Sequence, residues 1–503
     1  MSVRTLNYLC RLLYRGEYKR FMKPCSVEWV QNEYLLDLLR KNAGTVYGEK
    51  YGFSEIKSYE DFAEKVPLTV YEDYEPYINE ISEGRKNVLT AEDVTLLEPT
   101  SGSSGGKKLV PYTKALQREF QRGIRPWLYD IYKNVEGVCD GMSYWSITPV
   151  TDGKSYTKSG IPIGFEEDTA YFGRLEQAVM KKLFAVDGSV KFSGSMEDFY
   201  FQTASQLLAC KSLTLISVWN PTFLTILCDF IRDNINELVS LLTGDRREQV
   251  MDGAKENRFD IIFPDLKIIS CWADGSAADD IGEIKKRFPE VYIQPKGLLA
   301  TEGFFSFPLT GETGSRLSIY SHFFEFRRLS DGEIITAEKL TPGEYEIIVT
   351  TGGGFYRYQI GDIVEVIEVY PDSPPRIKFL RRSGISSDLC GEKLTEEFVR
   401  NVCKKLGITD HFCLLAPDGK GYCFYTTAEG ITDEILDGAL RESYHYNYCR
   451  QLGQLRRAEV CKVKGDPAKK YLERLTSEGM RLGDIKPAYL SRKTDWGKYF
   501  ERK

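Results

Sequence analysis

The chain of 503 residues is too long for a single hydrophobic core, so we expect one large domain and one smaller domain. Hydrophobic residues make up 42% of the sequence and charged residues 28%, a composition that excludes a largely disordered chain. The formal net charge is -6, and no dense block of lysine and arginine occurs, which argues against nucleic acid as a partner.

The cysteines, the histidines, the N-terminus and the most hydrophobic stretch of the chain limit the compartment and the chemistry that we expect. The 12 cysteines are scattered singly without a CxxC pair, which predicts reduced thiols in a cytoplasmic protein. Three histidines leave few members for a metal cluster or a Ser-His-Asp triad. The N-terminus does not resemble a signal peptide, and residues 213–231 contain Asn220, Pro221 and Asp229, which favours a buried strand and helix over a membrane span. We therefore expect no membrane partner. The sequence leaves the oligomeric state open, and a monomer is compatible with it.

The first ninety residues have helical patterns, at 27–39 and at 59–65, where Pro67 limits the second helix. From residue 94 the pattern changes to short apolar runs separated by helical stretches. These runs lie at 95–97, 213–218, 266–271 and 291–293. Such alternation is typical of parallel strands joined by crossover helices, so we predict an α/β fold with ligand loops beyond the carboxyl ends of the strands.

Residues 344–370 have the period of strands, and a PDSPP turn leads to a further strand at 377–380, which predicts a small β subdomain. The polar run SGISSDLCGEK then precedes a helix that starts near Thr395. We place the domain boundary at the start of this run, giving domains of residues 1–382 and 383–503. A hairpin pattern in FCLLAPDGKGYCFYTT, a helix near 433–444, a strand at 458–463 and a helix from Pro467 predict a smaller α+β domain.

The first candidate motif is EPTSGSSGGKKLVPYT, residues 98–113, directly after the predicted strand at 95–97. Its glycines allow the backbone to approach phosphates, its hydroxyl groups can donate hydrogen bonds, and its lysines can neutralise charge. The spacing of a Walker A loop is absent. The residues alone leave a flexible Gly/Ser turn as an equal alternative.

Two further motifs follow. PKGLLATEG, residues 295–303, delivers Glu302 at the end of an apolar run, and this carboxylate is either a cap or a ligand for Mg²⁺. TTGGGFYRYQIGDIVEV, residues 350–366, contains Asp362, which either hydrogen-bonds its own backbone in a turn or accepts hydrogen bonds from ribose hydroxyls.

In this order, the three motifs resemble the adenylate-forming enzyme superfamily, and specifically the bacterial branch of the auxin-responsive GH-three family of acyl acid amido synthetases. The resemblance covers nearly the whole chain and includes MSYWSITPVTDG, SGIPIGF, ISVWNPTFLTILCDFI and LKIISCWADGSA. It implies a large N-terminal adenylating domain, residues 1–382, with mixed sheets, helices and a small β subdomain. A smaller, mobile α+β domain, residues 383–503, would follow it.

The resemblance also implies roles for matched positions. The implied phosphate loop is formed by Thr100, Ser101, Gly102, Ser103, Ser104 and Gly105, with Lys108 as its catalytic lysine. The implied nucleotide ligands further along the chain are Asp274, Gly275 and Ser276 at the purine, Thr301 and Glu302 at the phosphates, Tyr358 and Asp362 at the ribose, and Arg382 at the hinge. Glu302 is also the implied Mg²⁺ ligand and a catalytic residue. Lys486 in GDIKPAYL is the best match for a catalytic C-terminal lysine, with an exposed surface lysine as the alternative.

The resemblance implies that ATP and Mg²⁺ activate a carboxylic acid as an acyl adenylate, which then passes its acyl group to an amine such as an amino acid. An acyl-CoA ligase with the same first step and a catalytically silent nucleotide-binding protein are the alternatives. The aromatic segments at 144–145 and 219–223 either line the acid pocket or belong to the core.

Overall fold

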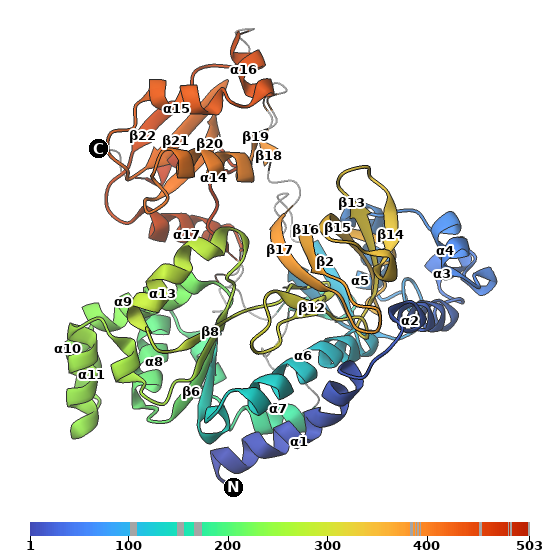
Figure 1. Cartoon of the computed structure of the whole chain (residues 1–503), viewed down its shortest axis with the longest axis horizontal. Coiled ribbons are helices and arrows are strands. Elements are labelled where there is room, and N and C mark those ends of the chain that lie inside the picture. The colour runs from blue at the N-terminus through green and yellow to red at the C-terminus, as the bar shows by residue number, and fades with distance from the viewer. Residues whose placement is uncertain are drawn as a thin grey trace. The chain divides into compact units, whose positions relative to one another are not determined.

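The computed structural model describes residues 1–100, 108–147, 155–164, 174–382, 386–387, 389, 392, 394–451, 455–480, 482 and 485–500. The chain forms two compact units, Met1–Leu380 and Arg381–Lys503 (Figure 1). Each unit has apolar clusters of its own.

The first unit begins with five α-helices in residues 1–82, which the structure describes in full, and all but the last start after a residue with a hydroxyl side chain. They are α1 (Val3–Phe21), α2 (Val27–Lys41), α3 (Val46–Lys50), α4 (Tyr59–Lys65) and α5 (Tyr71–Ser82). The side chains of Ser2, Ser26, Thr45 and Ser58 accept hydrogen bonds from backbone N–H groups in the first turns of α1 to α4. The helices predicted at 27–39 and 59–65 are confirmed as α2 and α4.

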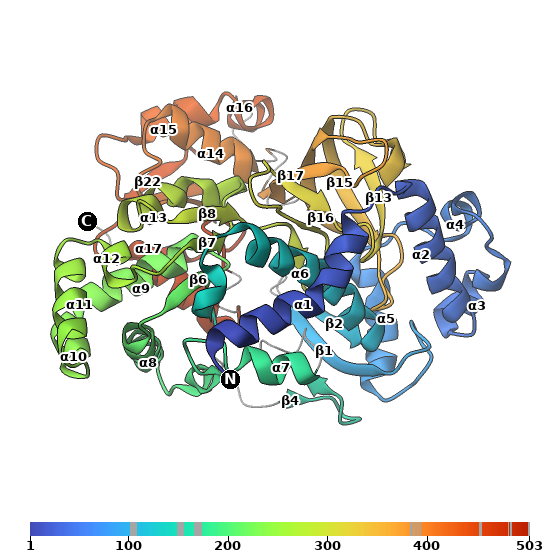
Figure 2. The same ribbon diagram turned by 60° about the horizontal axis from the view of Figure 1, so that its bottom comes forward.

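A hairpin and a long helix follow. Strands β1 (Val94–Thr100) and β2 (Lys108–Thr113) are antiparallel, and β5 (Pro162–Ile163) and β4 (Ser155–Tyr156) complete a sheet of order β2-β1-β5-β4. The run at 95–97 therefore belongs to a hairpin outside the parallel core, because β1 turns straight back into β2. The Thr113 side chain caps α6 (Lys114–Asn134). Helix α6 lies alongside α1, and its buried face packs against β2 and the hairpin at residues 299–304 (Figure 2).

Four parallel strands form the core sheet of the first unit. Three of them lie at the predicted runs 213–218, 266–271 and 291–293, whereas the strand at 142–145 was not predicted. Their order is β3 (Met142–Trp145), β6 (Leu213–Ser217), β7 (Ile268–Cys271) and β8 (Tyr292–Pro295). The helices between these strands are α7 (Arg174–Met180), α8 (Met196–Ala209), α9 (Pro221–Asp233), α10 (Ile235–Ser240), α11 (Asp245–Lys255), α12 (Phe259–Ile262) and α13 (Ile281–Arg287). Residues 213–231 are thus a buried strand and a helix. In the part of the chain that the structure describes, no helix combines the length and the apolar character needed to cross a membrane.

The predicted β subdomain is confirmed as a seven-stranded sheet. In spatial order its strands are β11 (Ser306–Phe307), β12 (Ser315–Leu317), β17 (Arg376–Arg382), β16 (Tyr358–Glu368), β15 (Gly343–Thr350), β13 (Phe323–Arg328) and β14 (Ile334–Thr336). The short hairpin of β9 (Leu299–Ala300) and β10 (Gly303–Phe304) connects the parallel sheet to it. An apolar cluster joins α2 to α5 with β13, β15 and β16.

The second unit has the predicted α+β character. Strands β20 (Cys413–Asp418) and β21 (Gly421–Thr426) form the expected hairpin, and β22 (Glu459–Lys462) pairs in parallel with β21. Two short strands pair before the first helix, β18 (Ser386–Ser387) and β19 (Leu394–Thr395). The helices are α14 (Glu396–Lys405), α15 (Asp433–Leu440), α16 (Tyr444–Gln451) and α17 (Pro467–Ser477).

One expectation about the cysteines is wrong. Cys423 and Cys461 form a disulfide between the neighbouring strands β21 and β22, whereas all twelve were expected to be reduced. The two residues are 38 positions apart in sequence, so nothing in their spacing reveals that their strands are adjacent.

Candidate functional site

The predicted phosphate loop connects the two strands of the β1–β2 hairpin. Thr100, the last residue of β1, pairs with Lys108, the first residue of β2. Ser101, Gly102, Ser103, Ser104 and Gly105 lie outside the described residues. Lys108 Nζ is 5.0 Å from the centre of the Tyr71 ring and 3.4 Å from Oε1 of Glu72, whose side chain is 62% exposed. Because an ion pair with so exposed a partner stabilises the lysine little, Lys108 can exchange Glu72 for a phosphate.

Thr301 and Glu302 form the two-residue turn between β9 and β10, since Ala300 pairs with Gly303. The Glu302 side chain is buried despite its place in a turn. Burial raises the pKa of the Tyr71 phenol, and the charge of Glu302 adds to the rise. The Lys108 ammonium lies over the Tyr71 ring, and the charge of Glu302 acts on the Tyr71 phenol. Two separately predicted motifs thus act on this tyrosine, which stands at the start of α5.

A buried polar network holds the Glu302 turn in place. The backbone N–H of Phe304 donates to Nε2 of His322 at 2.9 Å, so the ring proton is on Nδ1. Nδ1 lies 3.1 Å from Oε2 of Glu119 on α6, and both side chains are buried. Glu119 Oε1 accepts a hydrogen bond from the Tyr34 hydroxyl at 2.7 Å. His322 is thus a positioning residue that links Glu119 on α6 to the backbone just after Glu302.

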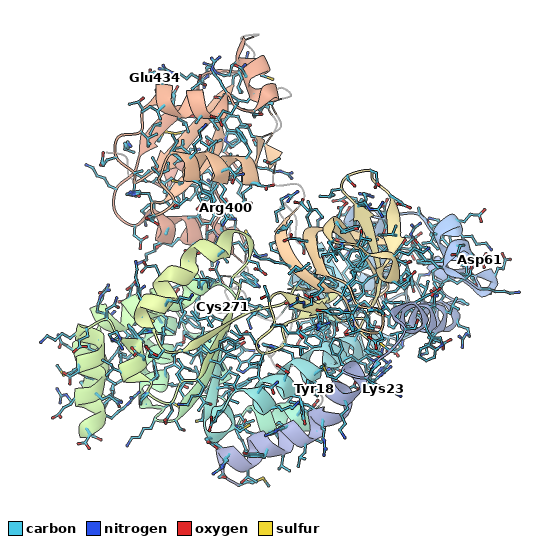
Figure 3. The ribbon with its side chains drawn as sticks, in the orientation of Figure 1. Tyr18, Lys23, Asp61, Cys271, Arg400 and Glu434 are labelled. Carbon is cyan, nitrogen blue, oxygen red and sulfur yellow. A yellow bond between two sulfur atoms is a disulfide. The ribbon has the colours of Figure 1, made fainter. Side chains whose placement is uncertain are left out.

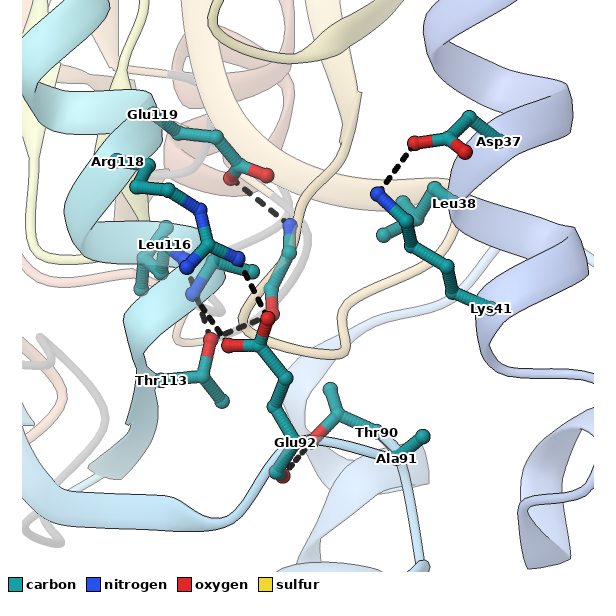
Figure 4. Close-up of polar contacts among 12 residues, drawn as sticks. Asp37, Leu38, Lys41, Thr90, Ala91, Glu92, Thr113, Leu116, Arg118 and Glu119 are labelled. Carbon is teal, nitrogen blue, oxygen red and sulfur yellow. Dashed lines mark hydrogen bonds and ion pairs between the residues drawn. The ribbon is translucent and has the colours of Figure 1, made fainter.

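The same carboxylate fixes the glycine-rich motif after β15. Glu119 Oε2 accepts the backbone N–H of Gly352 at 2.9 Å, and the Thr113 hydroxyl donates to the Gly352 carbonyl at 2.8 Å. Figure 4 shows Glu119 on α6 and Thr113 just before the first residue of that helix, beside the ion pair of Arg118 with Glu92. A Cβ on Gly352 would lie 2.3 Å from Glu119 Oε1, so only glycine fits.

Asp274 follows the carboxyl end of β7, where the purine loop was predicted. Burial raises the pKa of the Asp274 carboxyl to about 6, and Lys378 Nζ on β17, 3.7 Å from Asp274 Oδ1, opposes the rise. Gly275 and Ser276 begin a 3-10 helix, Gly275–Asp280, and their side chains lie outside the described set. A perturbed carboxylate at a strand end is a feature of ligand sites.

Tyr358 and Asp362 lie on β16, and both are buried. The register of β16 with β15 shifts between Gln359 and Ile363, and Gly361 within this bulge has a φ of +76°. Such a bulge redirects the side chain that follows, and here that side chain belongs to Asp362. Arg382 is the last residue of β17, and its side chain is outside the described set.

Lys486 belongs to the second unit, where its exposed side chain lies near Glu396 on α14. Burial raises the pKa of Glu396 to about 7, while the Tyr489 backbone and the charge of Lys486 oppose the rise. The structure thus gives Lys486 a local acidic neighbour.

Residues 19–259 match the GH3 family N-terminal domain, and residues 316–382 match the GH3 family central domain. The chain belongs to the GH3 family. The indole-3-acetic acid-amido synthetase GH3.2 of Arabidopsis thaliana is 23% identical over 427 residues, which cover 73% of this chain and 76% of the relative. The jasmonoyl-L-amino acid synthetase JAR4 of Nicotiana attenuata is 21% identical, with 81% and 80% covered.

Among solved structures, the AtGH3.15 acyl acid amido synthetase in complex with 2,4-DB has a TM-score of 0.81 at 17% identity, covering 99% of this chain and 97% of that one. The expected α/β fold of adenylate-forming enzymes, with a large N-terminal and a smaller C-terminal domain, is confirmed. The N-terminal match of this GH3 family chain includes Lys108, and the central match includes Tyr358, Asp362 and Arg382.

Sequence reasoning about this GH3 family chain missed Tyr71, Glu119 and the positioning role of His322. Glu119 left a signal, because it is a charged residue on the apolar face of α6 between Leu116 and Gly123, both buried. Tyr71 left none. Its place beside Lys108 depends on the packing of α5 against β2, which no local pattern reports.

Proposed function

We propose that this protein is an AMP-forming acyl acid amido synthetase, which activates a carboxylic acid with ATP and transfers the acyl group to the amine of an amino acid. Family membership and the amido synthetase names of its relatives support the reaction class. The observation that carries the proposal is that Lys108, at the start of β2, lies over the Tyr71 ring, while the charge of the buried Glu302 acts on the same tyrosine, so a lysine and a carboxylate from separate motifs act on one residue.

The reaction has two steps. A carboxylate oxygen of the acid attacks the α-phosphorus, and the bond to pyrophosphate breaks. The amine nitrogen then attacks the acyl carbon, loses a proton, and displaces AMP. The phosphate oxygens gain negative charge in the first step, and Lys108 with the backbone N–H groups of the 100–105 loop would stabilise that charge.

The donor set fits magnesium. Mg²⁺ takes oxygen ligands and is commonly held by one or two carboxylates together with substrate phosphates and water. Glu302 supplies one such carboxylate, and the described residues contain no group of three potential metal-ligating side chains. When bound there, Mg²⁺ would supply charge neutralisation at the phosphates. The Glu119–His322–Phe304 network keeps Glu302 in place for this role.

The remaining contacts are assigned from the same reasoning. Asp362 accepts hydrogen bonds from the ribose hydroxyls, with Tyr358 beside it. Residues 274–276 lie against the purine, and Thr301 lies at the phosphates. Residues 1–382 bind both substrates, whereas residues 383–503 form a mobile domain that follows Arg382 and presents Lys486 as a catalytic lysine.

The acceptor is tested by product analysis. The protein is incubated with ATP, Mg²⁺ and a panel of carboxylic acids, and either an amino acid mixture or coenzyme A is added. We expect acyl amides by mass spectrometry. Formation of acyl thioesters without amides would contradict the amide-forming step and identify an acyl-CoA ligase. Binding of ATP without release of pyrophosphate, for every acid, would identify a catalytically silent protein.

A further inference from the structure

Lys296 is a buried cation at the carboxyl end of the core sheet, directly after β8. Its Nζ atom lies 4.9 Å from the ring centre of Trp219, 5.0 Å from that of Trp127 and 5.9 Å from that of Trp145. It donates one hydrogen bond, to Ser217 Oγ at 2.7 Å. No ion pair joins Lys296 to a carboxylate within the described ranges. Burial lowers the pKa of its ammonium group to about 7.

The backbone around Lys296 leaves little freedom. The Lys296 N–H donates to the Cys271 carbonyl at 2.8 Å, next to the end of β7 (Cys271 is labelled in Figure 3). At Gly297, a Cβ would lie 2.0 Å from the carbonyl oxygen of Ser306, so the chain passes directly against β11. The backbone at Lys296 is thus held against β7 and β11, and the Lys296 side chain is buried.

A row of polar side chains crosses the sheet beside Lys296. The strand registers align Trp145 with Ser217, Ser217 with Ser270, and Ser270 with Gln294. Ser270 and Gln294 are fully buried. Gln294 Oε1 accepts from the Trp127 indole at 3.0 Å, but Gln294 Nε2 and Ser270 Oγ have no hydrogen-bond partner among the residues that the structure describes. Leaving such buried groups unpaired is unfavourable, which points to a ligand that satisfies them.

These atoms define the chemistry of that ligand. Lys296 Nζ and Gln294 Nε2 are donors, so their complement is an oxygen acceptor, and a buried cation favours an oxygen that carries negative charge. The three tryptophan rings offer flat apolar surface that suits an aromatic ring. The location agrees, because ligands bind beyond the carboxyl ends of parallel strands, and Lys296 directly follows the end of β8 as Asp274 follows the end of β7.

We propose that Lys296 is a specificity-determining residue of the acid site, and that the acid is an aryl carboxylic acid bearing a second anionic or hydroxyl oxygen, which Lys296 and Gln294 bind. This inference rests on the proposed function. The aryl ring of the acid packs against Trp127, Trp145 and Trp219. Lys296 and Gln294 bind the second oxygen, so the carboxylate that reacts with ATP remains free.

Matched pairs of acids test the proposal. Benzoate, phenylacetate and cinnamate are each compared with their 4-hydroxy and 4-carboxy derivatives. Binding to the free protein is followed by quenching of tryptophan fluorescence, and kcat/KM by acid-dependent pyrophosphate exchange. We expect at least one substituted acid to bind about tenfold or more tightly than its parent, and Lys296→Met to reduce that ratio to about one. Lys285→Met, which changes an exposed lysine on α13, should keep the ratio.

Three results separate the explanations. If Lys296→Met and Lys296→Gln weaken the substituted acid and its parent equally, Lys296 has only a structural role and the proposal is wrong. Equal affinity of the wild-type protein for every pair also overturns it. Selective binding seen by fluorescence, without pyrophosphate exchange for any acid, would support the assignment of Lys296 while contradicting the proposed function.

Discussion

At the scale of single residues, the site depends on side chains placed where water is scarce. Glu302 and Asp362 are both buried carboxylates, and Lys108 is largely shielded by the Tyr71 ring. The sequence could predict that these residues follow strands or lie on them, because apolar runs and glycines mark those positions. It could not predict their burial, since burial depends on segments far away in the chain, such as α5 at Tyr71.

Asp274 gives a prediction about stability and pH. Its pKa in the folded protein, about 6, is above the ordinary value of 3.8, so the folded state binds a proton more readily than the unfolded state. The free energy of unfolding should therefore rise as the pH falls from about 6 to about 4. Above pH 6 the charged, buried carboxylate costs on the order of 1–3 kcal/mol.

Chemical denaturation of Asp274→Asn at pH 7.5 and pH 4.5 measures this cost. The variant should gain stability over the wild type at pH 7.5, and the gain should be clearly smaller at pH 4.5, where the carboxyl of the folded protein is protonated. A gain that is the same at both pH values would show that Asp274 titrates normally.

The ribose assignment gives a second prediction. Asp362→Ala should raise the KM for ATP in pyrophosphate exchange by about tenfold or more, because a charge-assisted hydrogen bond to a hydroxyl contributes roughly 1.5–3 kcal/mol. Asp372→Ala, which changes an exposed aspartate in the following turn, serves as the control and should leave the KM unchanged. Full exchange activity in Asp362→Ala would contradict the assignment.

At the scale of elements, the parallel strands were the easiest to predict. Residues 213–218 (LTLISV) and 266–271 (LKIISC) are largely apolar runs, and the strands that they form, β6 and β7, are buried along their length. The run at 95–97 (TLL) has a similar local character but pairs with β2 in a hairpin, because so short a run carries no information about the partner strand. The bulge that orients Asp362 was likewise not predictable, since Gly361 alone is compatible with several turns.

The link between α6 and the glycine-rich motif gives a third prediction. Gly352→Ala introduces a Cβ against Glu119 Oε1 and should destabilise the protein by about 1–3 kcal/mol. Because Glu119 also positions His322, and His322 positions Phe304 after Glu302, we expect the concentration of Mg²⁺ that half-saturates activity to rise as well.

Gly282→Ala on α13 is the matched control. A Cβ at that position meets nothing within 4 Å, so alanine should stabilise the helix by up to about 1 kcal/mol. Thermal unfolding of both variants measures the difference. If Gly352→Ala is as stable as wild type and has an unchanged Mg²⁺ requirement, the network does not support Glu302.

At the scale of the whole molecule, the order of the motifs carried more information than any motif alone. The loop ending at Lys108 is ambiguous by itself, and its assignment depends on the motifs of Glu302 and Asp362 that follow it in the chain. The two-unit organisation could be predicted from length and from the polar run after Arg382. The substrate could not, because Lys296 and its three tryptophans come from α6, β3 and the ends of β6 and β8.

Acid-dependent exchange of pyrophosphate into ATP tests the central claim most directly. The wild-type protein with ATP, Mg²⁺ and labelled pyrophosphate should catalyse exchange only when a carboxylic acid is present. Lys108→Ala and Glu302→Gln should each lower the rate by about a hundredfold or more, whereas Lys41→Ala, an exposed lysine on α2, should not. Exchange that needs no acid, or that survives in both Lys108→Ala and Glu302→Gln, would contradict the account.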